Sequence, residues 1–348
     1  MTSKTLNIKS YFTRIFDWFK SLSLQSNNYI EDRTYHPFWV MIRKEISDLV
    51  RSWRFIILFS IIVLTCFSSI YTSLSQFSEA VKSFKEDEAF FFLKLFTLSD
   101  GTLPSFAMFI SFLGPLLGIS LGFDAINSEQ NKGTLSRIIS QPIYRDYVIN
   151  AKFLSALIVI SLLFVALTLL VLGAGLIAIG IPPTPDEIMR LFFFTLINIV
   201  YVAFWLNLSI FFSVKFKQPA TSALSGIAIW LFFSIFYNML VNFFAQAIAP
   251  KGMFLKSQIA AFSNFILNFR RFNPCYLFSE ATTILLMPNE RSLGTLTMEQ
   301  MEGIIPAPLP LGESLLVIWP QVTILIAGSI LLFALGYYSF MRREIRSR

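Results

Sequence analysis

Apolar residues along the chain gather in six long uncharged runs separated by short polar stretches. The runs cover residues 55–74, 105–123, 153–180, 191–214, 220–248 and 321–341, and none of the chain's 28 Lys and Arg or 21 Asp and Glu falls within them. A helix needs about 20 apolar residues to cross the hydrocarbon layer of a bilayer. The pattern therefore predicts an all-α, polytopic membrane protein with six transmembrane helices. Continuous runs also exclude a transmembrane β-barrel, because its strands alternate apolar and polar residues.

The composition and the charge distribution agree with this fold class. Hydrophobic residues make up 55% of the chain and charged residues only 14%, which is unlike a soluble domain. If the N-terminus is inside, the inner segments 1–54, 124–152, 215–219 and 342–348 hold 19 of the 28 Lys and Arg. Because cytoplasmic loops retain positive charge, we predict a multi-pass plasma-membrane protein with both termini in the cytoplasm. The excess of Lys and Arg in the inner segments accounts for the net charge of +7. We therefore expect no nucleic-acid partner.

Residues 1–54 form a predicted cytoplasmic N-terminal region, and residues 55–348 the six-span transmembrane domain. Six apolar residues near the end of the first region share one helical face, opposite basic and polar residues: Trp39, Ile42, Ile46, Leu49, Val50 and Trp53. Such a helix can lie in the headgroup layer, where its bases meet anionic lipid. We predict an amphipathic elbow helix that leads into the first span and contacts membrane lipids. Packing of this helix on other protein is the alternative, and residues 8–20 repeat the pattern more weakly.

Two outer segments are too long or too apolar to be simple connectors. Segment 249–320 contains Asn273-Pro274 and then the apolar stretch Cys275–Leu286, which is too short to cross a bilayer. A re-entrant or interface-parallel helix before the last span fits this stretch, because non-helical backbone at membrane depth must be covered by protein or water. Segment 75–104, with a charged cluster followed by three Phe, predicts a short helix at the outer surface.

Several kinds of chemistry are absent from the sequence. Charged residues inside spans mark ion paths and proton relays, so their absence argues against an ion-driven transporter. No Gly-x-x-x-x-Gly-Lys-Ser/Thr motif occurs, and the chain therefore lacks a phosphate loop of its own. Two distant cysteines, Cys66 and Cys275, and the single His36 provide neither a disulfide framework nor a metal centre. We predict a non-catalytic chain without a cofactor or metal of its own.

Three polar residues fall on one stripe of the fifth run: Asn238, Asn242 and Gln246. Polar side chains in spans commonly knit helices together. The alternative is that these three line a transport pathway.

The predicted cytoplasmic loop 124–152 has its own helical pattern. The stretch from Asn131 to Thr134 interrupts helix, and Thr134 can cap a new one. The new helix has an apolar face before Pro142 ends it, formed by Leu135, Ile138 and Ile139. A short helix with an apolar face can dock into the groove of a soluble partner. A solvated connector between two spans is the alternative.

The order of residues in this loop resembles the cytoplasmic loop of permeases from the type 2 ABC exporter family. That family tends to show an acid, then Gly-Thr-Leu, then Pro with Arg three residues later, and a small residue with Lys at the start of the third span. The matching residues are Glu129, Gly133, Thr134, Leu135, Pro142, Arg145, Ala151 and Lys152. Lys44-Glu45 in the elbow and the stretch from Asn273-Pro274 to Pro288 also resemble the family.

The resemblance implies that residues 124–152 include a coupling helix seated in a separate ABC ATPase subunit, which binds ATP and Mg²⁺. It implies a turn at Gly133, an N-terminal cap at Thr134, apolar partner contacts at Leu135 and Ile139, and a polar anchor at Arg145. A second permease, identical or similar, completes the expected complex. The predicted function is ATP-driven export, and spans without charge favour an amphiphilic or lipid-like cargo.

A second hypothesis keeps the ATPase but not the cargo. In it, the chain is a mechanical or scaffold subunit whose outer segment 249–320 acts on an extracytoplasmic protein. Deleting residues 251–270 separates the two hypotheses, because a scaffold would lose its partner while ATPase coupling persisted.

Overall fold

The computed structural model describes residues 36–80, 90–97, 104–141, 143–180, 182–248, 256–288 and 309–342. Every regular element in these residues is helical. The chain divides into two units, Met1–Val40 and Met41–Arg348, and the arrangement described below is that of the second unit. The weaker amphipathic pattern at 8–20 lies outside the described residues.

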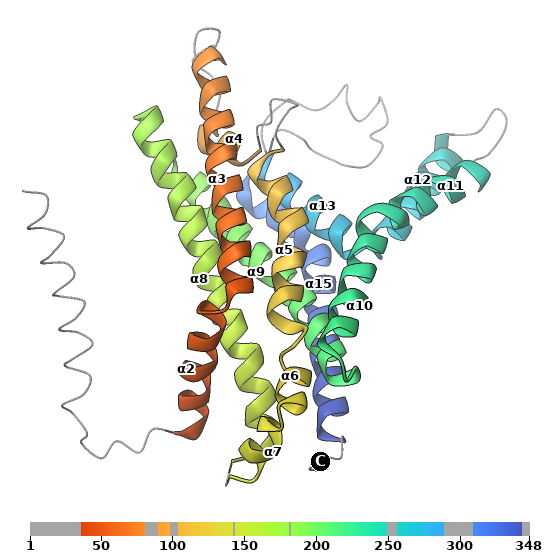
Figure 1. Ribbon diagram of the computed structural model, residues 1–348. Coiled ribbons are helices and arrows are strands. Elements are labelled where there is room, and N and C mark those ends of the chain that lie inside the picture. The colour runs from red at the N-terminus through yellow and green to blue at the C-terminus, as the bar shows by residue number, and fades with distance from the viewer. Residues whose placement is uncertain are drawn as a thin grey trace, which may run out of the picture. The chain divides into compact units, whose positions relative to one another are not determined.

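Six helices are long and apolar enough to cross a membrane, which confirms the predicted fold class (Figure 1). They are α3 (Trp53–Ala80), α5 (Phe106–Gly122), α8 (Arg145–Ile179), α9 (Pro185–Lys215), α10 (Pro219–Leu231) with its continuation α11 (Tyr237–Ile248), and α15 (Leu311–Met341). The chain is a multi-pass, all-α membrane protein.

Most of these helices extend beyond the uncharged runs, because a charged residue at the end of a span does not break helical backbone. Helix α8 begins at Arg145, so Lys152 lies within it. Helix α9 begins at Pro185 after a capping box between Thr184 and Glu187. Helix α15 begins at Leu311 and continues through Pro320, so residues 311–320 belong to the last span. The predicted outer segment 249–320 is therefore too long at its C-terminal end.

Helix α9 forms the centre of the bundle and is the most buried of the six spans. It packs mainly on α15 and α5, and also on α8, α10 and α13 (Pro274–Leu286). Glycines allow the approach of α5: a Cβ at Gly118 would lie 2.7 Å from the carbonyl oxygen of Val202, and one at Gly122 would lie 2.9 Å from that of Leu206. Small residues at helix contacts let membrane helices pack closely, and these two fix α5 against α9.

The fifth span is interrupted by a π-helical turn at Phe232–Phe236. Beyond the turn, α11 lies alongside α12 (Lys256–Arg270) (Figure 1). The Tyr237 hydroxyl donates a hydrogen bond to the Phe269 carbonyl oxygen at 2.6 Å, and the two rings stack. Part of segment 249–320 is thus folded, as its length suggested.

Helix α13 covers the apolar stretch predicted to be a short helix. Its N-cap is Asn273, whose Oδ1 accepts a hydrogen bond from the Cys275 N–H at 2.9 Å. The Asn273 side-chain amide also donates to the Phe233 carbonyl oxygen at 2.7 Å, within the π-helical turn. One side chain therefore joins the start of α13 to the interrupted fifth span.

Helix α4 (Phe91–Thr97) corrects the prediction for segment 75–104. A short helix is present, but Phe92, Leu93, Leu95 and Phe96 are buried among α3, α5, α8 and α9. A surface position is wrong for these residues because four large apolar side chains within five residues can all be buried only when other helices surround them. The charged cluster at 82–88 lies outside the described residues.

Helix α2 (Pro37–Val50) covers most of the predicted elbow, but Trp53 lies beyond a break at Arg51-Ser52 and begins α3. Ile42 is buried, and Ile46 and Leu49 pack against the core. These three residues therefore contact the chain's own helices rather than lipid, as the alternative interpretation of the pattern held.

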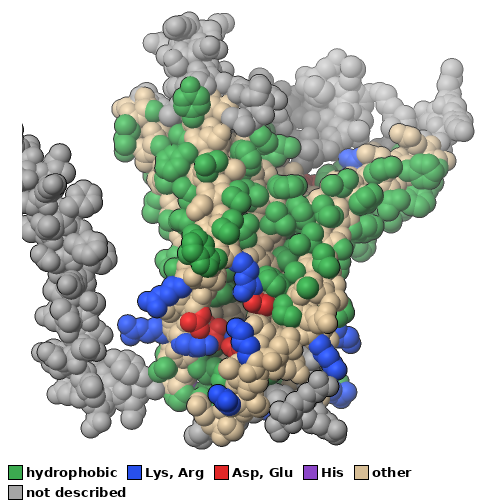
Figure 2. Space-filling model, in the orientation of Figure 1, with side chains coloured by type: hydrophobic (Ala, Val, Ile, Leu, Met, Phe, Trp, Pro, Cys, Tyr) green, Lys and Arg blue, Asp and Glu red, His purple; other side chains and the backbone are tan. Residues whose placement is uncertain are grey.

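Charged side chains gather where α2 meets the two short helices α6 (Asn127–Asn131) and α7 (Thr134–Ile139). Figure 2 shows this concentration of Lys, Arg, Asp and Glu below a face that is mostly hydrophobic. We refer to this part of the bundle as the charged end. The opposite end carries α4, α12 and α13.

Candidate functional site

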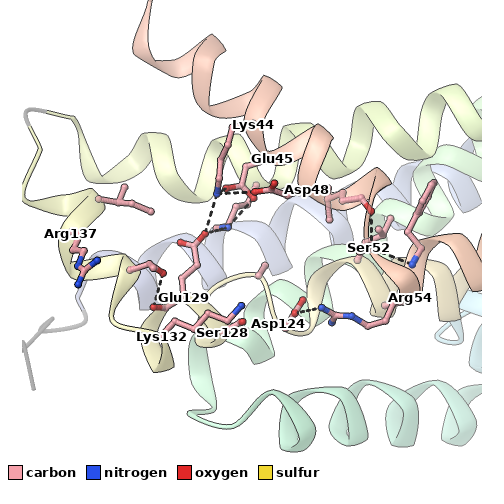
Figure 3. A pocket seen from close by; sticks show the side chains of 18 of the residues that line it. Lys44, Glu45, Asp48, Ser52, Arg54, Asp124, Ser128, Glu129, Lys132 and Arg137 are labelled. Carbon is pink, nitrogen blue, oxygen red and sulfur yellow. Dashed lines mark hydrogen bonds and ion pairs between the residues drawn. The ribbon is translucent and has the colours of Figure 1, made fainter.

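A pocket of about 520 Å³ lies at the charged end, between α2, the start of α3, the end of α5, the loop helices α6 and α7, and α8 (Figure 3). We call it the charged-end pocket. Five of its lining residues are basic and four are acidic: Lys44, Arg54, Lys132, Arg137 and Lys152, with Glu45, Asp48, Asp124 and Glu129. The pocket thus joins elements that are far apart in the sequence through charged side chains.

Lys152 is the centre of the ion-pair network in this pocket. Its Nζ donates to Oε2 of Glu45 at 3.0 Å and to Oε1 of Glu129 at 2.7 Å, and only 8% of its side chain is exposed. Glu45 comes from α2, Glu129 from α6 and Lys152 from α8. One ammonium group therefore connects the elbow, the loop and the third span.

Lys44 extends the network toward solvent. Its Nζ lies 2.9 Å from Oε1 of Glu45 and 3.1 Å from Oδ2 of Asp48. Burial alone would raise the pKa of Glu45, but Lys152 and Lys44 together hold that pKa below its ordinary value. Burial also works against the charge of Lys44, yet its hydrogen bond and proximity to Glu45 raise the Lys44 pKa. Both groups are therefore charged at neutral pH.

A separate pair joins the start of α3 to the end of α5. The Arg54 guanidinium donates to Oδ2 of Asp124 at 2.6 Å and lies over the Phe123 ring, 4.9 Å from its centroid. About half of the Arg54 side chain remains exposed. Because exposed ion pairs contribute little to stability, this pair mainly orients the guanidinium at the mouth of the pocket.

The loop between α5 and α8 is held to the end of α9 and the residues after it by hydrogen bonds between side chains and backbone. Ser213 Oγ accepts hydrogen bonds from the N–H groups of Ile126 and Asn127, and Asn131 donates to the Lys217 carbonyl oxygen. Gly133 then adopts φ +70°, a left-handed conformation that glycine accepts readily. The turn predicted at Gly133 is therefore present between α6 and α7.

The capping role predicted for Thr134 is wrong. Gly133 occupies the N-cap of α7, and Thr134 is the first helical residue. The Thr134 hydroxyl donates to the Glu129 carbonyl oxygen at 3.1 Å, so it stabilises the turn after α6 instead of accepting from the N–H groups of α7. A cap needs non-helical backbone, which this threonine does not have.

Leu135 was predicted to contact a partner, but the structure buries it in the chain's own core with 2% of its side chain exposed. Its neighbour Ile138 is half-buried and lines the charged-end pocket. The side chain of Ile139 and the whole of Pro142 lie outside the described residues. Arg145 is partly exposed and begins α8.

The structure brings three of the predicted loop residues, Glu129, Thr134 and Lys152, to the lining of one pocket. It places Asn238, Asn242 and Gln246 together on α11, away from that lining. Asn242 is exposed, and its Oδ1 accepts a hydrogen bond from Arg270 at 2.8 Å. A role of this stripe in a pathway stays a prediction.

Sequence reasoning did not identify Arg190, which is fully buried at the opposite end. Its guanidinium donates to Asp186, to the Ser314 hydroxyl, and to the carbonyl oxygens of Leu285 and Leu309. The sequence did hold a signal for Arg190: Asp186 lies four residues before it, so the two can pair on one helical face just before the uncharged run 191–214.

A buried acid at the opposite end is Glu280 in α13. Arg271 donates to both of its carboxylate oxygens, at 2.7 and 3.1 Å, and Glu280 is only 3% exposed. The hydrogen bond raises the Arg271 pKa further. The pair closes the turn between α12 and α13.

Within the described parts of the chain, no group of three or more His, Cys, Asp and Glu is placed to hold a metal ion, and Cys66 and Cys275 are both free. The charged end is therefore a set of ion pairs around a pocket, suited to binding charged groups and to joining helices.

Six spans, short helices between the second and third spans and a buried short helix before the last span make this chain a polytopic helical membrane protein. Residues 39–345 match the sequence profile described as ABC-2 family transporter protein. The chain belongs to this family and is a transmembrane subunit of an ABC transporter. Such permeases generally work with an ATPase and with a second permease.

Two similar proteins are described as probable ABC transporter permease proteins NosY. The protein from Stutzerimonas stutzeri is 24% identical over 224 residues, which cover 62% of this chain and 72% of the relative. The protein from Pseudomonas aeruginosa is 24% identical over 209 residues, with 58% and 68% covered. The predicted family is thus confirmed.

Proposed function

We propose that this chain is the permease subunit of an ATP-driven exporter in the plasma membrane. A separate ATPase chain binds ATP and Mg²⁺, and the charged end faces the cytoplasm together with both termini. The excess of Lys and Arg in the inner segments supports this orientation. Loop helices α6 and α7 receive the movement of the ATPase, and a second permease copy completes the complex.

The observation that carries this proposal is the connection of three elements through Lys152. Its ammonium group pairs with Glu45 of α2 and Glu129 of α6, at 3.0 and 2.7 Å. Separating a buried charge from its partners is costly. A displacement of α6 therefore moves α2 and α8 with it, so movement at the loop reaches the first and third spans.

The first test is affinity purification of the tagged chain from its native membranes in mild detergent. An ATPase with a phosphate-binding loop in equal stoichiometry is the expected result. If the folded chain is purified without an ATPase and ATP hydrolysis stays at background, the proposal fails.

The second test uses the purified complex and Lys152→Met, which keeps the length of the side chain and removes its charge. We expect the ATPase to copurify as before but its hydrolysis to lose dependence on the permease. Lys215→Met is the matched control, because Lys215 is exposed at the end of α9 and lies outside the pocket. Unchanged coupling in the Lys152 variant would refute the connection.

Arg145→Glu tests the predicted polar anchor at the start of α8. We expect lower coupled ATPase activity with normal membrane insertion, because Arg145 is the first residue of α8 and precedes the uncharged run 153–180. An unchanged ATPase rate in a correctly inserted variant would remove Arg145 from the coupling residues.

An amphiphilic or lipid-like cargo is part of the proposal. The uncharged runs within the spans support it, because a path lined by such helices offers little to a hydrated ion. Transport assays with the reconstituted complex should show turnover-linked movement of amphiphilic probes. Transport of an inorganic ion at a rate comparable with ATP turnover would contradict this cargo class.

The exposed aromatic residues around α12 favour a second candidate function, a mechanical subunit that acts on an extracytoplasmic protein. Phe265 and Phe272 are 56% and 76% exposed. Deleting 251–270 would also remove the contact of Phe269 with Tyr237, so the double substitution Phe265→Ser with Phe272→Ser is a cleaner test. Loss of a copurifying outer protein with intact ATPase coupling would favour the scaffold.

A further inference from the structure

The charged-end pocket lies where the apolar spans give way to charged residues. Phe55, near the start of α3, and Leu121, near the end of α5, line its inner part. Trp53 stands beside this level with 78% of its side chain exposed, and exposed Trp is typical of the membrane interface. We infer that this apolar edge of the pocket lies near the depth of the lipid headgroups.

The four carboxylates of the pocket are already paired with bases. Glu45 and Glu129 pair with Lys152, Asp48 with Lys44, and Asp124 with Arg54. Two further bases line the pocket, Lys132 and Arg137.

Lys132 and Arg137 are both exposed, and neither forms an ion pair with another described residue. In Figure 3 no dashed line reaches either side chain; Lys132 lies beside Ser128, and Arg137 stands apart from them on α7. The Ser128 side chain also lines the pocket and adds a hydroxyl donor. The five bases and four acids of the lining leave a net charge of +1, and Lys132 and Arg137 are the two bases that can turn to an anion.

We propose that the charged-end pocket binds the phosphate headgroup of an anionic phospholipid from the leaflet that borders the charged end. Lys132 holds the phosphate and Ser128 donates to it, while Arg137 adds positive charge at the α7 edge of the pocket. The acyl chains leave the pocket past Phe55 and Leu121 toward the hydrocarbon layer. Basic pockets at this depth are suited to anionic headgroups, because the same site provides charge and an apolar exit.

Two features favour a phospholipid over a soluble anion or a protein segment. The wall of the pocket changes from charged residues to Phe55 and Leu121, which a free phosphate would not use. The volume of about 520 Å³ lies in the range of sites for small molecules, about 300–1,000 Å³, and suits one headgroup. This proposal does not depend on ATPase coupling, and its test needs no ATPase.

The experiment uses the full chain reconstituted into nanodiscs of phosphatidylcholine with phosphatidylglycerol as the minor component. After extraction into detergent and washing, the phosphatidylglycerol retained per protein is counted by mass spectrometry. We expect the wild type to retain this lipid selectively. We expect Lys132→Gln with Arg137→Gln to weaken retention by about tenfold or more, because each base near a membrane surface contributes on the order of 1 kcal/mol.

The matched control is Lys215→Gln with Lys217→Gln, which removes the same charge from exposed positions of the charged end outside the pocket. It should retain lipid as the wild type does. A monodisperse elution profile establishes that each variant is folded, and Lys132→Gln alone, with an intermediate loss, provides a second comparison.

Three results would overturn the proposal. Equal retention by the Lys132/Arg137 variant and the wild type would show that the lipid sits elsewhere. Displacement of phosphatidylglycerol by inorganic phosphate added to the wash would show that the pocket takes a free anion. Loss of a copurifying protein from the variant, with lipid retention unchanged, would assign the pocket to a protein partner.

Discussion

Two buried bases, Lys152 at the charged end and Arg190 at the opposite end, are held in different ways. Lys152 contacts the side-chain carboxylates of Glu45 and Glu129, which come from two other elements. Arg190 donates to the backbone carbonyl oxygens of Leu285 and Leu309, and also to a hydroxyl and to one carboxylate of its own helix. Both are nearly removed from solvent.

The difference in partners implies a difference in mobility. A guanidinium that bonds to two backbone carbonyls in fixed directions cannot shift without moving those segments, because its donors form a rigid planar fork. An ammonium group is a compact charge with rotatable donors, and carboxylate side chains can turn to follow it. The opposite end is therefore built to stay fixed, whereas at the charged end α2, α6 and α8 can move together while their ion pairs persist.

The largest expected effect is that of Arg190→Ala. Removal of the guanidinium leaves buried carbonyl oxygens without a donor, so we expect destabilisation of about 3–5 kcal/mol, as for a broken buried pair. The measurement is the apparent unfolding temperature in detergent, followed by loss of the monodisperse elution peak. Arg270→Ala is the control, because Arg270 forms an exposed hydrogen bond to Asn242.

Arg190→Lys tests whether the charge or the geometry of the guanidinium stabilises this end. A lysine keeps the charge but cannot reach several acceptors in the fork geometry, so most of the loss should remain. Wild-type stability in the lysine variant would mean that charge alone, and not the fixed geometry, holds this end together.

The next effect in size is that of Lys152→Met. The substitution leaves the Glu45 and Glu129 carboxylates without their shared partner, and we expect a loss of about 1–3 kcal/mol. Adding Glu45→Gln and Glu129→Gln should recover most of the stability, because no unpaired charge then remains. The same unfolding assay measures both variants.

Coupling should respond differently from stability. If the network transmits movement, the triple variant stays uncoupled even though it is stable again. Recovery of permease-dependent ATP hydrolysis in the triple variant would mean that the charges serve folding alone.

Much of the fold was predictable from the sequence, because spans are set by the requirement that backbone polar groups be satisfied within lipid. All six runs became helices, and the apolar stretch after Asn273-Pro274 became α13. Helix ends were less predictable. Charges such as Lys152 and Arg190 looked like boundaries, but each lies inside a helix where neighbouring elements satisfy it.

The candidate site was predictable only as a list of residues. The order of residues in the loop was enough to name Glu129, Thr134 and Lys152. The ion pair of Glu45 with Lys152 was not predictable, because it depends on how α2 packs. Leu135 illustrates the limit. An apolar residue on a short helix fits a partner's groove and the chain's own core equally well, and only the packing of the spans decides for the core.

A smaller effect is expected for Glu280→Ala at the opposite end. Glu280 is buried, but Arg271 keeps 35% of its side chain exposed and can turn to solvent. The loss should therefore be about 1–2 kcal/mol, less than for Arg190, because only one hydrogen-bonded charge pair is broken. Thermal unfolding of Glu280→Ala beside Arg190→Ala tests this order, and a larger loss for Glu280 would reverse it.

The smallest effect is a pH dependence that distinguishes the charged end. Because the pKa of Glu45 is lower in the folded chain than its ordinary value of 4.5, its ion pairs add stability above that value. This contribution is lost as the pH falls below 4.5 and through the lowered pKa, since the unfolded chain then binds the proton first. The network around Lys44 and Lys152 should therefore loosen in acid.

Glu45→Gln isolates this contribution, because glutamine keeps the shape and cannot titrate. Unfolding temperatures of the wild type and the variant, measured from pH 6 downward, should differ most at pH 6 and converge as Glu45 becomes protonated. Glu313→Gln is the control for acid effects elsewhere, because Glu313 lies in the first turn of α15 outside the charged-end pocket. A gap between wild type and Glu45→Gln that stays constant with pH would show that Glu45 acts through packing and not through charge, and the charged end would then be as rigidly built as the opposite end.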